Sequence, residues 1–171
     1  SMNCLITSAI FRFLQKQGVQ THFVDQVSET EWVTKTLKMI SLEVVVRNTL
    51  AGSTAKKFQM EEGTPLEATL VEFYSKVDEP GDPFISDAQA LMLNTVEKQE
   101  HLDELKFIAL KVNTSLKEFF SKCGINLIDF KLEFGRDAQG HFVLGDEISP
   151  DSCRLWDQTT NEKMDKDRFR R

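Results

Sequence analysis

Charged and apolar side chains alternate along one predicted strand in the second half of the chain. Residues 127–134 read Leu-Ile-Asp-Phe-Lys-Leu-Glu-Phe, so Asp129, Lys131 and Glu133 share one face of that strand. The opposite face carries only apolar side chains and can pack on a hydrophobic core. The strand therefore presents two carboxylates on either side of an ammonium group.

A further carboxylate, Asp146, follows the strand that we predict over residues 141–144. If the two strands form a hairpin in which Arg136 pairs with His141, Glu133 lies diagonal to Asp146 on the same face. Two such carboxylates suit Mg²⁺, which keeps several waters and takes its other ligands from nucleotide phosphates. The alternative is a solvated charged face, and the pattern alone favours it because alternating charge is common on half-buried strands.

Two arginines and a serine form a second candidate group. Arg47 ends a run of valines, Ser53 follows a glycine that permits close backbone approach, and Arg154 lies in a predicted loop. A guanidinium group matches phosphate oxygens with two parallel hydrogen bonds, so this group can surround a phosphate. The alternative, in which both arginines pair with nearby carboxylates, is favoured by the local pattern alone.

Hydrophobic periodicity predicts the elements that position these residues. We expect helices over residues 3–17, 86–98 and 101–123, and strands over 21–24, 32–37, 42–47, 70–75, 125–134 and 141–144. The valines at 44–46 indicate a strand buried on both faces. We further expect 38–41 to join two strands, 145–157 to form an irregular loop and 161–171 to begin a helix. The order of elements predicts an α+β fold.

Composition excludes several classes of partner. The net charge of −6 argues against non-specific nucleic-acid binding, which uses Lys and Arg to displace counterions. No apolar run approaches the roughly 20 residues needed to span a bilayer. The three cysteines show neither metal nor disulfide spacing, which favours reduced intracellular thiols, and Cys123 is expected in the core. The three histidines are expected to be structural or exposed.

Three longer segments carry a specific combination of motifs. They are Leu-Glu-Val-Val-Val-Arg-Asn with Ala-Gly-Ser over residues 42–53, Asp-Phe-Lys-Leu-Glu-Phe-Gly over 129–135, and Leu-Gly-Asp-Glu-Ile-Ser-Pro-Asp with Arg-Leu-Trp-Asp over 144–157. Shorter matches lie at 21–23, 82–83 and 163–170. Together these segments resemble the phosphoribosylaminoimidazole-succinocarboxamide synthase (SAICAR synthetase) family, from about residue 3 to the end of the chain.

The resemblance implies a two-lobed, kinase-like α+β fold with antiparallel sheets and a nucleotide cleft between the lobes. Residues 1–40 would be the remainder of an N-terminal nucleotide-binding lobe, and residues 41–171 a C-terminal lobe that binds substrate and metal. The family begins with a glycine- and lysine-bearing hairpin over the ATP phosphates and ends with a closing helix, so the resemblance implies a chain truncated at both ends. A sheet edge exposed in this way can recruit another chain, which leaves a homodimer open.

The family's activity implies an ATP-dependent, amide-forming ligase of purine biosynthesis. Its substrates are L-aspartate, 5-amino-1-(5-phosphoribosyl)imidazole-4-carboxylate (the carboxylated ribotide) and ATP, with Mg²⁺ as cofactor, in the cytoplasm. The ribotide carboxylate attacks the γ-phosphate of ATP to give an acyl phosphate, and the aspartate amine then displaces phosphate. No nucleic-acid or membrane partner is expected. The alternative is an inactive fragment that binds ribotide only.

By the same resemblance, Glu133 and Asp146 are expected to hold Mg²⁺, and Arg47, Ser53 and Arg154 to hold the 5′-phosphate of the ribotide. These implied roles fit the local chemistry of the residues. With the resemblance, we therefore expect a metal site rather than a solvated charged face, and a phosphate site rather than local ion pairs of the two arginines.

The remaining expected roles concern catalysis and the nucleotide. Asp129 and Lys131 would contact the aminoimidazole carboxylate or the incoming aspartate. The backbone of Lys38 and Met39 would meet adenine where the lobes join. Two further residues are expected near the nucleotide or aspartate, Lys76 and Asp82.

Overall fold

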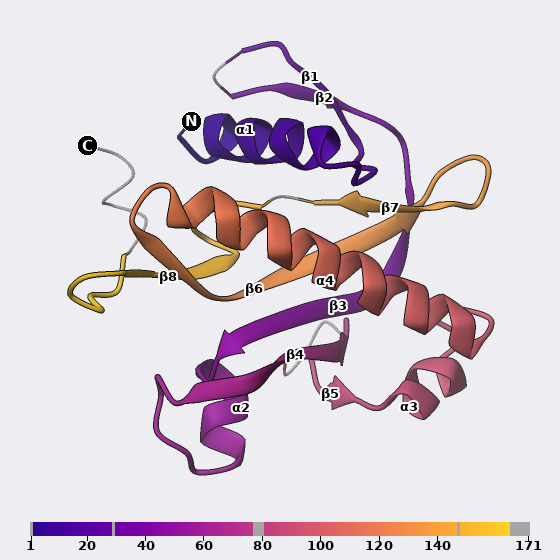
Figure 1. Ribbon diagram of the computed structural model, residues 1–171. Coiled ribbons are helices and arrows are strands. Elements are labelled where there is room, and N and C mark those ends of the chain that lie inside the picture. Colours follow the sequence, from indigo (N-terminus) through magenta and orange to yellow (C-terminus); the bar gives the residue numbers. More distant parts are fainter. Residues whose placement is uncertain (1, 29, 77–80, 147, 165–171) are drawn as a thin grey trace.

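A six-stranded antiparallel sheet forms the centre of the fold in the computed structural model, which describes residues 2–28, 30–76, 81–146 and 148–164 (Figure 1). The strand order is β5-β4-β3-β6-β7, and β8 also pairs with β6. The strands are β3 (Lys38–Thr49), β4 (Pro65–Ser75), β5 (Phe84–Ile85), β6 (Ile125–Arg136), β7 (Phe142–Gly145) and β8 (Cys153–Asp157). Helices and antiparallel strands together confirm the expected α+β class.

The other elements surround this sheet. Helix α4 (Gln99–Ser121) crosses one of its faces, and α1 (Met2–Lys16) lies beside the small hairpin of β1 (Phe23–Gln26) and β2 (Trp32–Thr34) (Figure 1). Two short helices complete the fold, α2 (Gly52–Lys57) and α3 (Asp87–Met92). Across the described residues, none of the helices combines the length and apolar character needed to cross a membrane.

The core lies between α4 and one face of the sheet. The apolar stripe of α4 is buried against the core-facing positions of β3 and β6, and its members are Leu102, Leu105, Ala109, Val112, Leu116 and Phe120. Helical spacing places these side chains on one side of the helix. A reciprocal amide pair joins Asn48 of β3 to Asn113 of α4, with distances of 2.8 and 2.9 Å. The helix therefore fixes one face of the sheet and leaves the other for chemistry.

The hairpin of β6 and β7 differs by one residue from the predicted register. Arg136 pairs with Phe142, whereas the sequence predicts His141 as its partner. A shift of one residue turns every side chain of a strand to the opposite face. The observed register places Leu144 opposite Phe134, and both side chains are buried in the core. Burial of these apolar groups explains why this register is preferred.

Strand β3 also differs from its prediction. Residues 38–41 do not join two strands but belong to β3, which continues across a bulge between Met39 and Glu43. Of the three valines, Val44 and Val46 are fully buried, whereas Val45 is only partly buried on the face away from α4. The predicted boundary between lobes at residue 40 falls inside this strand and stays a prediction.

Three further expectations need correction. The predicted loop 145–157 contains β8, because its short alternating run gains hydrogen bonds by pairing with β6. The helix predicted over 86–98 ends near Leu93, and Asn94 takes a left-handed conformation with φ of 56°. Cys123 is exposed rather than in the core. The helix expected at 161–171 falls mostly outside the described residues, and residues 161–164 are not helical, with Lys163 in a bridge to Trp156.

Candidate functional site

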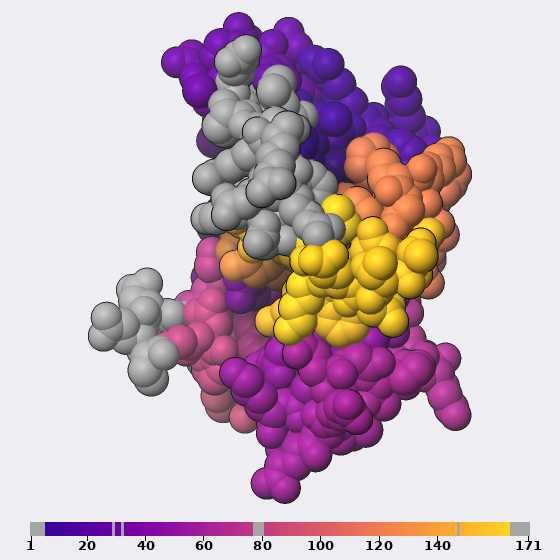
Figure 2. Space-filling model, turned by 90° about the vertical axis from the view of Figure 1, so that its left-hand side faces the viewer, coloured from indigo at the N-terminus to yellow at the C-terminus, as the bar shows by residue number. Residues whose placement is uncertain are grey.

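The face of the sheet away from α4 gathers the charged residues. Strand register sets Arg47 opposite Asp129 at one end of this face and Glu43 opposite Glu133 further along. Strand β8 adds Arg154, which pairs with Asp129. Opposite residues of antiparallel strands point to the same side, so these groups share one surface, which we call the charged face. In Figure 2, the yellow segment that contains β8 lies between the indigo N-terminal part and the magenta part that contains α2 and β4.

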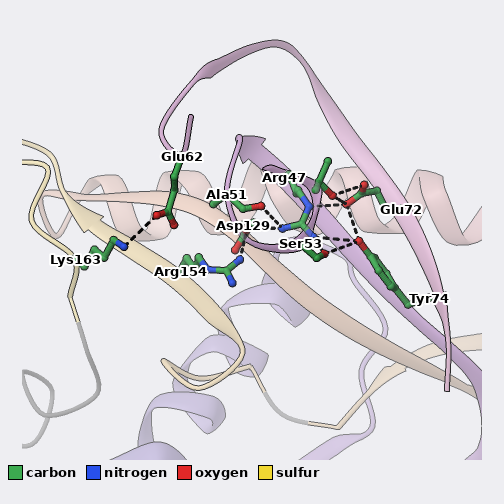
Figure 3. Close-up of polar contacts among 10 residues, drawn as sticks. Arg47, Ala51, Ser53, Glu62, Glu72, Tyr74, Asp129, Arg154 and Lys163 are labelled. Carbon is green, nitrogen blue, oxygen red and sulfur yellow. Dashed lines mark hydrogen bonds and ion pairs between the residues drawn. The ribbon is translucent and has the colours of Figure 1, made fainter. Parts of the chain in front are cut away.

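Arg47 is the most constrained residue of this face (Figure 3). Its side chain is only 4% exposed and pairs with Glu72 at 2.5 Å and with Asp129 at 2.8 Å. Its Nη1 also donates to the carbonyl of Ala51, and its Nη2 donates to the Ser53 hydroxyl at 3.2 Å. Burial works to lower the pKa of Arg47, but the hydrogen bonds and negative charges around it raise the pKa overall. The guanidinium is therefore a fixed positive charge.

Asp129 joins the two arginines. Arg47 Nη1 and Arg154 Nη1 each donate to Asp129 Oδ2 over 2.8 Å. The carboxylate is nearly buried, whereas the Arg154 side chain is 46% exposed. A cavity of about 320 Å³ opens beside this group and is lined by Asp129, Lys131 and Arg154 among others. The two arginines therefore converge on one carboxylate oxygen next to Ser53, which is the pairing with nearby carboxylates that the local sequence pattern favours, and their role toward a phosphate stays a prediction.

The thiol of Cys153 also lines this cavity but does not supply a nucleophile. Burial raises the pKa of Cys153 to about 12, and the charge of Asp129 acts in the same direction. A thiol with such a pKa stays protonated at physiological pH, and the thiolate is the reactive form.

Gly52 leaves the space that the Arg154 guanidinium occupies. A Cβ on Gly52 would lie 2.5 Å from Arg154 Nη1, and the residue has a left-handed φ of 63°. Only glycine adopts this conformation without steric cost and also leaves room for the guanidinium. The turn after β3 thus positions Ser53 and Arg154 together.

Two lysines neutralise the carboxylates in the middle of the charged face. Lys131 pairs with Glu43 at 3.1 Å, and Lys76 pairs with Glu133 at 2.5 Å. Burial works to lower the pKa of Lys131, but the bond to Glu43 and the charges around it raise the pKa overall. The bond to Glu133 raises the pKa of Lys76. Both lysines therefore remain ammonium groups and are not bases at neutral pH.

The position of Asp146 depends on a left-handed backbone conformation and not on the alternation of side chains along a strand. It follows Gly145, which lies opposite Glu133, so the two predicted metal ligands are neighbours. Its φ is 56°, in the left-handed region. His22 Nε2 lies 2.9 Å from the Asp146 carbonyl oxygen and, since that oxygen can only accept, the ring donates. Burial lowers the pKa of His22, with the bond to Asp146 opposing the shift.

The donor chemistry of Glu133 and Asp146 fits part of a Mg²⁺ site. Glu133 and Asp146 offer hard carboxylate oxygens, the ligand type that Mg²⁺ takes together with substrate phosphates and waters. Within the described residues, no three His, Cys, Asp or Glu side chains are arranged to hold a metal ion. Two carboxylates fit a site completed by a nucleotide, and they do not form a closed metal cage.

Of the two residues expected near adenine, Met39 lies at the far end of the charged face, opposite Gly135, whereas Lys38 lies opposite Arg136 on the other face. Met39 packs over Gly135 and Gly145, where added Cβ atoms would approach its side chain to 3.1 and 3.3 Å. Lys38 and Met39 also line a second cavity of about 270 Å³. The two glycines leave room for the Met39 side chain next to Glu133.

Asp82 lies beside the end of the strand that carries Glu72 and Tyr74. It is half-buried in the segment before β5. The neighbouring Pro83 accepts a backbone hydrogen bond from Ser75 over 2.9 Å, which sets this segment beside the end of β4, just before Lys76.

Four residues of the site escaped sequence reasoning: Glu43, Glu72, Tyr74 and His22. Glu72 and Tyr74 alternate on β4, which is a signal for a shared face but not for what lies opposite. Glu43 lies within the first of the three motifs, and its parity with Arg47 indicates a common face. The contact between His22 and Asp146 spans 124 residues, so no local pattern reports it.

Comparisons with known proteins identify the family of this chain. The sequence model of the SAICAR synthetase family matches residues 1–171. The phosphoribosylaminoimidazole-succinocarboxamide synthase of Nautilia profundicola is 51% identical over 170 residues, which cover 99% of this chain and 72% of that protein.

Solved structures show the same relationship. The synthase from Ehrlichia chaffeensis is 42% identical with a TM-score of 0.92, and a SAICAR synthetase (Type-2) in complex with ADP is 43% identical with a TM-score of 0.92. Each match covers 99% of this chain and 72% of the other. The fold and family expected from the sequence are confirmed, and the chain belongs to the SAICAR synthetase family of ligases.

Proposed function

We propose that this chain condenses L-aspartate with the carboxylated ribotide, using ATP, to give the succinocarboxamide ribotide, ADP and phosphate in purine biosynthesis. The names of its relatives and the ADP found in one related structure support this activity. The single observation that carries the proposal is the convergence of Arg47 and Arg154 on one oxygen of Asp129, beside Ser53.

The arginine end of the charged face binds the 5′-phosphate of the ribotide. Arg154 is partly exposed and, among the described residues, pairs with Asp129 through Nη1, so its remaining donors contact phosphate oxygens. Ser53 and Arg47 Nη2 complete the contact from the other side. Asp129 holds both guanidinium groups at a fixed separation, so less ordering is needed when the phosphate arrives.

The residues in the middle of the charged face take part in the chemical step. The Lys131 ammonium, beside Glu43, offers positive charge to the ribotide carboxylate as it attacks the γ-phosphate. A fixed charge at this point stabilises a transition state that gains negative charge on the transferring group. Because its pKa is raised, Lys131 acts through charge and position and does not accept a proton.

Glu133 and Asp146 would hold Mg²⁺, which when bound would neutralise charge on the ATP phosphates. Lys76, which pairs with Glu133, would then be free to contact the nucleotide or aspartate, and Asp82 lies in the adjacent segment. Lys38 and Met39 meet the adenine through their backbone. In this arrangement residues 1–40 contribute to nucleotide binding, and residues 41–171 bind substrate and metal.

The experiment that tests the proposal mixes the protein with ATP, Mg²⁺, L-aspartate and the carboxylated ribotide, and measures ADP and the succinocarboxamide product by chromatography. Product formation that requires all four components supports the proposed reaction. A full-length form that makes no product under these conditions would contradict it.

Calorimetry separates this reaction from ribotide binding alone. Ribotide that binds without ATP-dependent product would favour the binding-only alternative, and ribotide that does not bind at all would exclude both. Sedimentation velocity measures the homodimer, which stays a prediction.

A further inference from the structure

We propose that Tyr74 is a further ligand of the phosphate at the arginine end of the charged face, an inference that rests on the proposed function. The argument begins with the donors of Arg47. Its Nε donates to Glu72, and its Nη1 donates to Asp129 and to the Ala51 carbonyl. Only the Nη2 edge bonds to neutral hydroxyl groups, so only this edge can change partners without separating an ion pair.

Two hydroxyl groups meet this edge. Nη2 lies 3.2 Å from the Ser53 Oγ and 3.2 Å from the Tyr74 hydroxyl, and the two oxygens are 3.1 Å apart. The three polar atoms therefore form a triangle (Figure 3). A phosphate oxygen that Ser53 can reach is also within reach of the phenol, because the hydroxyl groups already touch each other.

The Tyr74 hydroxyl has two neutral or weakly bonded acceptors in reach, the Ser53 hydroxyl at 3.1 Å and the Glu72 carboxylate. The phenol donates to Glu72 over 3.4 Å, near the upper limit for a hydrogen bond. Glu72 accepts shorter bonds from Thr54, at 2.7 and 3.0 Å, and from Arg47. Glu72 therefore loses little if the phenol turns to an incoming phosphate, which is a stronger acceptor because it is charged.

The ring of Tyr74 is fixed in position. It meets Phe84 edge to face with centroids 5.9 Å apart, and Lys57 lies 4.4 Å above the Phe84 ring. Backbone pairing of Tyr74 with Glu43 on β3 and with Phe84 on β5 holds β4 between its two neighbouring strands. A fixed ring presents its hydroxyl without the loss of side-chain freedom that a flexible donor would suffer on binding.

Tyr74 is the single tyrosine of the chain, which allows a direct test. The probe is ribose 5-phosphate, titrated by calorimetry into the wild-type chain and into Tyr74→Phe, Ser53→Ala and Thr69→Val. Thr69 is the matched control, since it lies on the same strand but its hydroxyl bonds to Asn48, which faces α4. Tyrosine labelled with ¹³C at Cζ gives one NMR signal that reports on the phenol.

We expect Tyr74→Phe to weaken ribose 5-phosphate binding about tenfold, as the loss of one hydrogen bond to a charged ligand does. Thr69→Val should bind as the wild type does, and the wild-type Cζ signal should move on saturation. Wild-type affinity in Tyr74→Phe, with weaker binding in Ser53→Ala, would overturn the role of Tyr74 alone. No binding by the wild-type chain would overturn the proposed phosphate site together with it.

Discussion

Lys76 and Glu133 form an ion pair across the charged face, with the lysine nitrogen 2.5 Å from the carboxylate. The lysine thereby occupies one of the two carboxylates that we expect to hold Mg²⁺. The same bond raises the pKa of Lys76, so the ammonium persists at neutral pH. Metal and lysine must therefore compete for Glu133.

This competition predicts opposite effects of one substitution on two ligands. Lys76→Met should tighten the binding of Mg²⁺ alone several-fold, because Glu133 loses its competing cation, and should weaken Mg²⁺-ATP binding, because a positive charge near the phosphates is lost. Calorimetric titration with MgCl₂ and then with Mg²⁺-ATP measures both. Weaker binding of Mg²⁺ alone in the variant would show that Lys76 does not compete for the metal.

Substitution of Asp146 tests the other metal ligand. Asp146→Asn should abolish Mg²⁺-dependent turnover in the complete enzyme, because a neutral amide replaces a charged ligand, while the exposed position keeps the fold intact. Steady-state assays across a range of Mg²⁺ concentrations measure the loss, and circular dichroism monitors the fold. The control is Glu118→Gln, which changes an exposed acid on α4. Activity near that of the wild type in Asp146→Asn would remove this residue from the metal site.

Arg154 should not tolerate replacement by lysine. Arg154→Lys keeps the charge but loses the planar fork that contacts both Asp129 and a phosphate, so ribotide binding should fall by about tenfold or more. The KM for the carboxylated ribotide and a calorimetric titration measure the effect. Arg136→Lys is the control, since Arg136 pairs with Glu97 outside this site. Unchanged affinity in Arg154→Lys would remove Arg154 from the phosphate site.

The buried carboxylate between the two arginines should matter for stability. Asp129→Ala leaves Arg47, which is 4% exposed, without one of its two carboxylate partners, and we expect a loss of about 3–5 kcal/mol in the free energy of unfolding. Urea unfolding of the variant and the wild type measures the difference. A loss below about 1 kcal/mol would mean that Glu72 alone compensates the guanidinium.

A second ion pair, away from the site, should make stability depend on pH. Burial works to raise the pKa of Asp87, but hydrogen bonds from Lys106 and Gln99 and the lysine charge lower it below its ordinary value of 3.8. Since the folded pKa is the lower one, the stabilisation is complete above pH 3.8 and is lost as the pH falls through the folded value. Urea unfolding of the wild type and Asp87→Asn at pH 7 and pH 3 should show a difference that shrinks in acid. An equal difference at both pH values would contradict this assignment.

Local patterns in the sequence predicted which charged residues share one face of the sheet. The period-two alternation at Asp129, Lys131 and Glu133 predicted a shared face, and the structure places all three on it. The convergence of Arg47 with Arg154 was not predictable from periodicity, because it depends on β8 pairing with β6 across an irregular segment. The family resemblance supplied that relationship, since it carries information about contacts that no single chain segment encodes.

The sequence-based predictions failed where a single residue determines the register of a strand pair. The hairpin register was wrong by one position because the length of a turn does not by itself fix which residues pair, and burial of Leu144 decides it. Asp146 lies beside Glu133 despite that error, because its left-handed backbone and the contact with His22 direct the chain after β7. Long-range contacts of this kind become visible only in three dimensions.

Four positive side chains of the charged face already have acidic neighbours, namely Arg47, Arg154, Lys131 and Lys76. An anion that enters therefore meets cations whose charge the carboxylates already balance, and it contacts the donors that these ion pairs leave over. Chloride or a simple monocarboxylate gains little at such a surface, because it carries a single negative charge and few acceptor atoms. A phosphate dianion does gain, so the prearranged neutrality of this surface acts as a filter that favours multiply charged ligands over the abundant singly charged ones.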